Sequence, residues 1–129
     1  MCGRYALDAS VDQLEDFFFA SSNVVQALPS DWNISPTKEI YLVKNEADNK
    51  RVVDTALWGL VPHWASDNLR AANAINARIE SISEKPTFRE AFKRFHCLIP
   101  ASGYYEWATE LGRYKPKQPF YISYEDKSL

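Results

Sequence analysis

Residues 40–58 read IYLVKNEADNKRVVDTALW, and this stretch decides the fold class. Ile40–Lys44 and Arg51–Trp58 are rich in the β-branched and aliphatic residues that favour strands, whereas Asn45–Lys50 between them is polar. Two strand-like runs joined by a short polar segment predict an antiparallel β-hairpin. We therefore expect an antiparallel sheet and place the other elements around it.

Upstream of the hairpin, the sequence predicts a strand, a helix and a long connection. Met1–Leu7 suits a short strand. Ser10 and Gln13 stand at capping-box spacing and open a helix that we expect to end near Ala20. Residues 21–38 contain recurring asparagine and proline and predict an irregular connection without a regular element. The expected apolar stripe of the helix is Val11, Leu14, Phe17 and Phe18.

Downstream of the hairpin, the pattern predicts an extended segment, a helix and further strands. In Asn73–Glu80, strict alternation places Asn76, Arg78 and Glu80 on one face of an extended segment. Thr87 and Glu90 again stand at capping-box spacing before a short amphipathic helix, whose stripe is Phe88, Ala91, Phe92 and Phe95. The last expected strands are Cys97–Pro100, Gly103–Trp107 and Phe120–Glu125.

This order of elements indicates an α+β fold, mainly an antiparallel β-sheet or open barrel with short flanking helices. A chain of 129 residues with 46% hydrophobic and 25% charged residues suits one domain, which we assign to residues 1–129. Fifteen Lys and Arg against 17 Asp and Glu give a net charge of −2, so any site for a polyanion is a local patch.

The composition also argues against several classes of protein. The first twenty residues lack a basic start and a long apolar run, which argues against a secretory signal. No stretch approaches the roughly 18 apolar residues of a membrane helix, so we expect a soluble, cytoplasmic protein without a membrane partner. Two cysteines and two histidines without CxxC or HxxxH spacing argue against a metal site, and we expect no cofactor.

Cys2 is the first candidate for chemistry, because removal of Met1 would make it the amino-terminal residue. A terminal amine has a pKa of about 7.7–8.0, so part of it is neutral at pH 7, unlike a lysine at about 10.4. Such an amine attacks an aldehyde to form a Schiff base, and the adjacent sulfur can then close a thiazolidine ring. The alternative is that Cys2 is an incidental small hydrophobic residue.

Glu106 lies between large aromatic residues in an expected strand. If desolvation raises its pKa, it can serve as a general acid and base at neutral pH. If instead it lies on an edge and points to water, it has no such role. Alternation along the strand does not choose between these two interpretations.

Asn76 could orient a carbonyl or sugar oxygen, and Arg4 and Arg78 could hold phosphate. The alternatives are that Asn76 pairs with backbone and that the arginines form ordinary surface salt bridges. Trp64 is one of several aromatic residues that could stack on unpaired bases, the others being Trp58, Tyr104 and Trp107, although Trp58 is more simply a core residue.

Several separated segments, taken together and in this order, resemble the SOS response-associated peptidase (SRAP) family, which includes an animal 5-hydroxymethylcytosine-binding protein. The resemblance spans essentially the whole chain and corresponds to the amino-terminal part of the family domain. The segments are Met1–Tyr5, Asn33–Thr37, Trp58–Trp64, Ile75–Glu80, Glu84–Arg89 and Cys97–Trp107.

The resemblance implies a role in the DNA damage response. It implies that Cys2 captures the ring-opened aldehyde of an abasic site in single-stranded DNA as a thiazolidine crosslink, with autoproteolytic removal of Met1 and lyase-like chemistry. It further implies that Asn76 holds the opened sugar and Glu106 moves protons. By the same motif match, the DNA contacts are expected from Arg4, Trp64 and Arg78, in a monomer.

The family also carries a catalytic histidine in a downstream His-x-Arg-Met-Pro-like segment, which these 129 residues do not include. The expectation from the resemblance is therefore a truncated SRAP-like domain. Two other functions stay open. One is an amino-terminal-nucleophile glutamine amidotransferase, which also begins Met-Cys-Gly; the other is a non-covalent reader of single-stranded or modified DNA.

Overall fold

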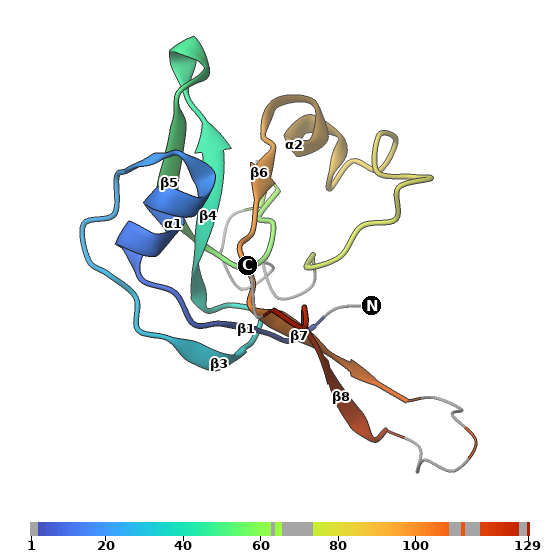
Figure 1. Cartoon of the computed structure of the whole chain (residues 1–129). Helices are drawn as coiled ribbons and strands as arrows, with labels where there is room; N and C mark the ends of the chain where they lie inside the picture. Colours follow the sequence, from blue (N-terminus) through green and yellow to red (C-terminus); the bar gives the residue numbers. More distant parts are fainter. Residues whose placement is uncertain (1–2, 63, 66–73, 109–111, 113–116, 127–128) are drawn as a thin grey trace.

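A computed structural model of the chain describes residues 3–62, 64–65, 74–108, 112, 117–126 and 129. Within these residues the chain forms two four-stranded sheets and two short α-helices, which confirms the α+β class (Figure 1). One sheet, here sheet A, has the strand order β3-β1-β7-β8, and the other, sheet B, has the order β2-β5-β4-β6. The two sheets form an open arrangement rather than a closed barrel.

The predicted hairpin forms the centre of sheet B. Strands β4 (Glu39–Asn45) and β5 (Arg51–Leu57) pair antiparallel from Glu39↔Leu57 to Asn45↔Arg51, and a 3-10 turn η1 (Ala47–Asn49) joins them. This is the hairpin expected from residues 40–58. The short edge strands β2 (Ser21–Ser22) and β6 (Cys97–Leu98) complete the sheet on β5 and β4.

Sheet A is built from segments far apart in the sequence. Its strands are β1 (Tyr5–Leu7), β3 (Asp31–Ile34), β7 (Gly103–Trp107) and β8 (Pro119–Ile122). The prediction of an irregular connection over residues 21–38 was wrong, because β2 and β3 both lie within it. These strands form by pairing with β5 and β1, and local composition does not reveal such long-range pairing.

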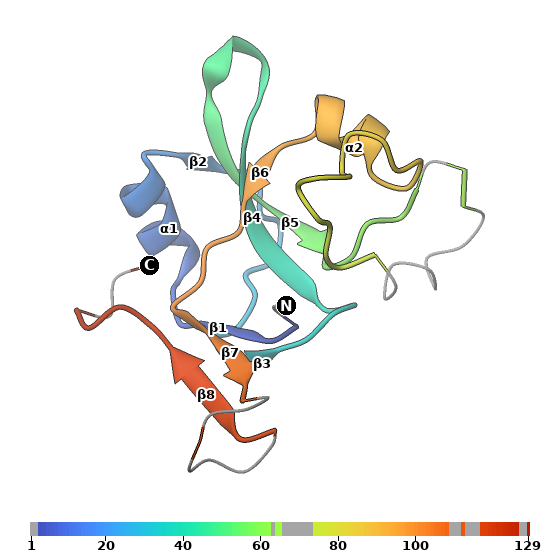
Figure 2. The same cartoon turned by 90° about the vertical axis from the view of Figure 1, so that its right-hand side faces the viewer.

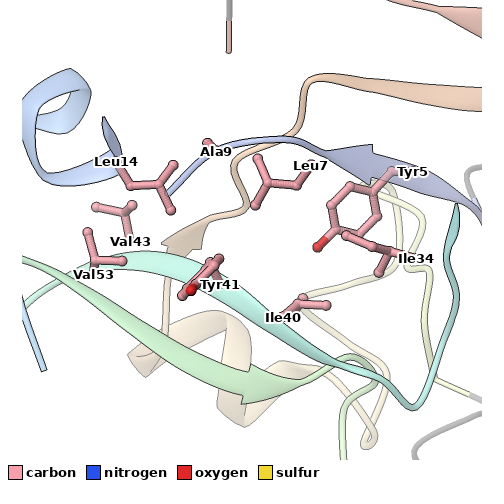
Figure 3. Close-up of a cluster of buried hydrophobic side chains, with 9 residues drawn as sticks. All are labelled: Tyr5, Leu7, Ala9, Leu14, Ile34, Ile40, Tyr41, Val43 and Val53. Carbon is pink, nitrogen blue, oxygen red and sulfur yellow. The ribbon is translucent and has the colours of Figure 1, made fainter. Parts of the chain in front are cut away.

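The core lies between the inner faces of the two sheets. Figure 3 shows side chains from the β1 side and the β4 side pointing toward one another, among them Leu7, Tyr41 and Val43. Leu14 and Val53 are completely buried there, and the other core members are Tyr5, Ala9, Ile34 and Ile40. The core therefore joins the first strand to the central hairpin, and it holds the start of the chain against sheet B.

Helix α1 (Val11–Phe18) begins as the sequence predicts. The Gln13 N–H donates to Ser10 Oγ at 3.3 Å, and the Ser10 N–H donates to Gln13 Oε1 at 2.8 Å, so the capping box is confirmed. The helix ends two residues before Ala20, with Phe19 in the left-handed region at φ 50°. The expected stripe was wrong at one position, because Phe17 is 49% exposed.

Helix α2 (Arg89–Arg94) is shorter and lies among exposed residues. The capping box expected from Thr87 and Glu90 was wrong, because Phe88 occupies the N-cap and no side chain bonds to the helix start. The extended segment expected over Asn73–Glu80 was wrong at its carboxyl end, where residues 79 and 80 lie in a turn. Its described part, residues 74–80, contains no strand and leads into consecutive turns at 79–84. No described helix has the length and apolar character to span a bilayer.

Candidate functional site

Cys2 and Met1 lie outside the described residues, as does His63. The first described residue is Gly3, to which Cys2 is joined, and Arg4 and strand β1 follow directly. Two groups of predicted residues are described, one in sheet A and one in the loop after β5.

Arg4, the residue before β1, is held by β3 and β7, the two strands that flank β1 in sheet A. Its carbonyl accepts from the Tyr105 N–H on β7 at 2.9 Å, and its Nη1 donates to Asn33 Oδ1 on β3 at 2.8 Å. Asn33 is itself oriented, because its N–H donates to Asp31 Oδ1 at 2.8 Å. Lys38 donates to the other oxygen of Asp31 at 2.6 Å, and this bond is the main cause that lowers the pKa of Asp31. The guanidinium is thus positioned by a network.

Asn33 is a residue that sequence reasoning did not single out. It lies in the Asn33–Thr37 segment, but no local pattern indicates that its side chain meets Arg4, 29 residues away. The contact arises because β3 and β1 are adjacent in sheet A. The only feature of the sequence that could have indicated Asn33 was its position in a family motif.

Glu106 is half-buried in β7 and lies opposite Phe120 of β8. Alternation along β7 places Glu106 on the same face as Tyr104, whereas Tyr105 shares the other face with its cross-strand partner Arg4. The structure thus places Arg4, the residue before β1, beside β7, the strand that carries Glu106. It distributes them between the two faces of sheet A.

Trp64, Asn76 and Arg78 belong to the chain that follows β5. All three are exposed, Trp64 by 52%. The Leu60 N–H donates to the Ala74 carbonyl at 3.0 Å, so residues 60 and 74 lie side by side. Figure 2 looks onto the side of the molecule where residues 74–88, the helix α2 and β1 are all visible. Exposed aromatic, amide and guanidinium groups on one loop can reach a ligand from solvent.

The outer face of sheet A, turned away from the core, carries an aromatic cluster. Tyr105 and Tyr121 are cross-strand partners with ring centroids 5.1 Å apart. The ring centroid of Trp32, on β3, lies 6.3 Å from that of Tyr121. The Tyr105 hydroxyl donates to the Trp32 carbonyl at 2.9 Å and fastens β3 to the cluster. Burial, followed by the charges of Tyr105 and Asp8, raises the pKa of Tyr121.

Trp32 and Tyr121 were not among the predicted site residues. Of the aromatic residues that were considered, Trp107 and Tyr104 are about two-fifths exposed. Trp58 is half-buried and packs edge-on against Tyr5 at 5.3 Å, as expected for a residue at the core. The Trp32–Tyr121 contact joins the two edge strands of sheet A, so only the strand order reveals it.

The described residues include no group of three His, Cys, Asp or Glu side chains arranged to hold a metal. What they offer instead is a positioned guanidinium, exposed aromatic rings and a half-buried carboxylate near the amino terminus. Cationic groups interleaved with exposed rings suit unpaired nucleic acid, because phosphates pair with the cations and bases stack on the rings.

Comparison with known proteins shows one consistent family. The sequence pattern described as SOS response associated peptidase (SRAP) matches residues 1–129. The chain is 38% identical over 112 residues to the abasic site processing protein YoqW of Bacillus subtilis (strain 168), a match covering 83% of this chain and 48% of that protein. It is 27% identical over 129 residues to the abasic site processing protein YedK of Escherichia coli (strain K12), covering 95% of this chain and 53% of YedK.

A crystal structure of a protein from Bacteroides thetaiotaomicron has the same fold. It superposes with a TM-score of 0.76 at 26% identity, over 97% of this chain and 55% of the other. The chain thus spans about half the length of the relatives that it matches.

Proposed function

The chain belongs to the SOS response associated peptidase family, and from this premise we propose that it processes abasic sites in single-stranded DNA through Cys2. The observation that carries the proposal is the family match over residues 1–129, together with relatives named abasic site processing proteins. The protein would act as a monomer in the cytoplasm, on the nucleoid if its host is bacterial.

The proposed reaction begins with removal of Met1, which the chain performs as its own peptidase. The freed α-amine of Cys2 attacks the C1′ aldehyde of the ring-opened sugar, and loss of one water gives a Schiff base. The Cys2 thiol then adds across the C=N bond. Its sulfur bonds to C1′ and its proton passes to nitrogen, so a five-membered thiazolidine forms without any oxidant or reductant.

In this proposal Glu106 carries the protons. It would protonate the sugar oxygen as the ring opens and the hydroxyl that leaves as water. Its support is its position in β7, on the strand beside the start of β1. Asn76 would hold the opened sugar through its amide, and its support is that it is exposed on the loop after β5.

The remaining roles concern the strand around the lesion. Arg4 would bind a phosphate next to the abasic nucleotide, supported by the hydrogen bond that its guanidinium donates to Asn33 and that orients it. Arg78 would bind a second phosphate from the loop, and Trp64, half exposed, would stack on a neighbouring base. A single strand bends into such a site at lower cost than a duplex.

Intact mass spectrometry tests the proposal directly. The protein is first shown by mass to lack Met1, with methionine aminopeptidase added if the residue is retained. It is then mixed with an abasic oligonucleotide or with the undamaged oligonucleotide of the same sequence. The expected result is an adduct with the abasic strand alone, at the summed mass less one water.

Two cysteine variants sharpen this test. Cys2→Ala should form no adduct, whereas Cys97→Ala should react like the parent, because partial desolvation raises the pKa of the exposed Cys97 thiol and disfavours its thiolate. Glu106→Gln should form the adduct about 100-fold more slowly, at the lower end of general acid–base contributions. A correctly trimmed chain that stays unlinked overturns the proposal, as does ammonia release from glutamine without any DNA adduct.

A further inference from the structure

The outer face of sheet A contains a hollow of about 310 Å³, lined by Asp8, Trp32, Ser102, Tyr121 and Ser123. We propose that this hollow binds one unpaired base of the DNA strand, and that it prefers bases with an exocyclic amino group over thymine. The inference rests on the proposed function for the source of the strand. None of its residues is among the predicted crosslinking or phosphate-binding residues.

Small residues occupy the two central strands between the rings that line the hollow. Ala6 of β1 and Gly103 of β7 are cross-strand partners, and Ala6 is completely buried. The order β3-β1-β7-β8 puts Trp32 and Tyr121 on the two edge strands, yet their rings lie only 6.3 Å apart. The edge-strand rings therefore lean inward over the small central pair.

Gly103 holds Tyr121 in this position. A Cβ on Gly103 would lie 2.5 Å from both Cζ and Oη of Tyr121, so the ring occupies the space of the missing side chain. The Tyr105 ring packs beside it at 5.1 Å, and the Tyr105 hydroxyl bonds to the backbone of Trp32. The aromatic surface is thus fixed from two sides before any ligand arrives, which lowers the entropy cost of binding.

The ring geometry determines how a base can bind. Inserting a base between two rings needs about 7 Å between parallel planes, because each stacked layer requires about 3.5 Å. The ring centroids of Trp32 and Tyr121 are only 6.3 Å apart, and the two ring planes are tilted by 52° to each other. A base therefore stacks on an open ring face, and Trp32 and Tyr121 remain 53% and 40% exposed for that contact.

The polar groups of the hollow select the base. Asp8 accepts from the Ser30 hydroxyl through Oδ1 at 2.7 Å, and its N–H donates to Ser102 Oγ at 2.9 Å. A carboxylate accepts readily from an exocyclic amino group, as in contacts to cytosine N4. Thymine presents only one N–H, between two carbonyl oxygens that the carboxylate would repel. The same negative charge disfavours phosphate in the hollow.

The hollow adjoins the proposed phosphate contact. Asn33, which accepts from the Arg4 guanidinium, is the next residue after Trp32, and Tyr105 donates its N–H to the Arg4 carbonyl. Arg4 and the ring of Tyr105 share the outer face of sheet A. A strand with a phosphate on Arg4 would therefore place an adjacent base at the hollow.

Binding of intact oligonucleotides tests the inference without the crosslink. Fluorescence anisotropy with labelled dC and dT decamers, on a Cys2→Ala background, reports non-covalent affinity alone. Trp32→Ala should weaken dC binding about 5- to 100-fold, because stacking contributes about 1–3 kcal/mol per base, and Trp32→Phe should restore most of it. Phe95→Ala, which removes a 77% exposed ring at the end of α2 and outside the lining of the hollow, is the matched control and should bind like the parent.

Asp8→Asn provides a second variant that leaves the rings in place. It should reduce the preference for dC over dT, because the amide offers both a donor and an acceptor. Equal binding by Trp32→Ala and Phe95→Ala, or an unchanged base preference in Asp8→Asn, would overturn the inference. Binding of free dCMP as tight as that of the dC decamer would overturn the assignment to a DNA strand.

The outcomes separate this inference from the proposed function. With Cys2 present, crosslinking of the abasic oligonucleotide by the parent protein reports the proposed function, and the dC binding of the Cys2→Ala background reports the hollow. If the parent forms no crosslink but its dC binding still depends on Trp32, the proposed Cys2 reaction is overturned and the base site in the hollow is supported. If the parent forms the crosslink but its dC binding does not depend on Trp32, the Cys2 reaction is supported and the base site in the hollow is overturned.

Discussion

Substitution of Gly103 by alanine tests whether the outer face of sheet A is packed as described. A Cβ there would lie 2.5 Å from two atoms of the Tyr121 ring and 2.7 Å from the Ile122 carbonyl oxygen. Carbon atoms in van der Waals contact lie about 3.5–4.0 Å apart, so the new atom overlaps its neighbours by about 1 Å. The ring can turn away, but the carbonyl belongs to β8, and the strand itself must shift.

The cost follows from this overlap. Extra methyl groups in well-packed regions destabilise by about 1–3 kcal/mol, and the involvement of backbone places Gly103→Ala in the upper half of that range. For a domain of this size, 1 kcal/mol corresponds to a shift in Tm of about 4 °C. The expected loss is therefore about 8–12 °C in Tm.

Gly3→Ala is the matched control. Among the described residues other than its chain neighbours, no atom lies within 4 Å of a Cβ at Gly3. The same chemical change there should leave the free energy of unfolding within about 1 kcal/mol of the parent. Urea unfolding followed by circular dichroism, together with thermal melts of the parent and both variants, measures the difference.

The double variant Gly103→Ala/Tyr121→Ala assigns the cost to its source. Removing the ring relieves two of the three overlaps and leaves the one with Ile122, so the double variant should lose less than the sum of the two single losses. Gly103→Ala as stable as Gly3→Ala would refute the packing. Strict additivity in the double variant would refute the role of Tyr121.

Three further outcomes are expected for the rest of the fold. Leu14→Ala, at a completely buried position in α1, should cost about 2–5 kcal/mol in urea unfolding, and a cost below 1 kcal/mol would contradict the described core. Ser10→Ala should cost about 1 kcal/mol by loss of the capping box, with Ser10→Asp, which also caps, as the retained control. The Lys44 hydrogen bond, then that from the Thr55 N–H, lowers the pKa of Asp54 from 3.8, so this stabilisation is present above about pH 4 and is lost as pH falls through the lowered value. Asp54→Asn should therefore show a shallower loss of stability than the parent between about pH 4 and pH 2 in urea titrations, and an unchanged slope would contradict the pairing.

For the candidate site, the sequence indicated which residues to consider but not how they are arranged. The residues Arg4 and Glu106 were chosen from their types and motifs, and the structure places Arg4, the residue before β1, beside the strand that carries Glu106. It places them on opposite faces of sheet A, which no motif specifies. The Trp32–Tyr121 hollow was missed entirely, since these residues are separated by 89 positions and belong to the two edges of one sheet.

The sequence by itself determined the features whose causes are local. The hairpin of β4 and β5 follows from two apolar runs around a polar turn, and the start of α1 follows from a capping box within four residues. Only the tertiary structure decided which segments pair across long distances. Strand β3 exists because β1 provides its hydrogen-bond partners, and the Tyr121 ring can approach Trp32 because Gly103 leaves room for it. Such contacts depend on the space left by other strands, and that space is set by the packing of the whole chain.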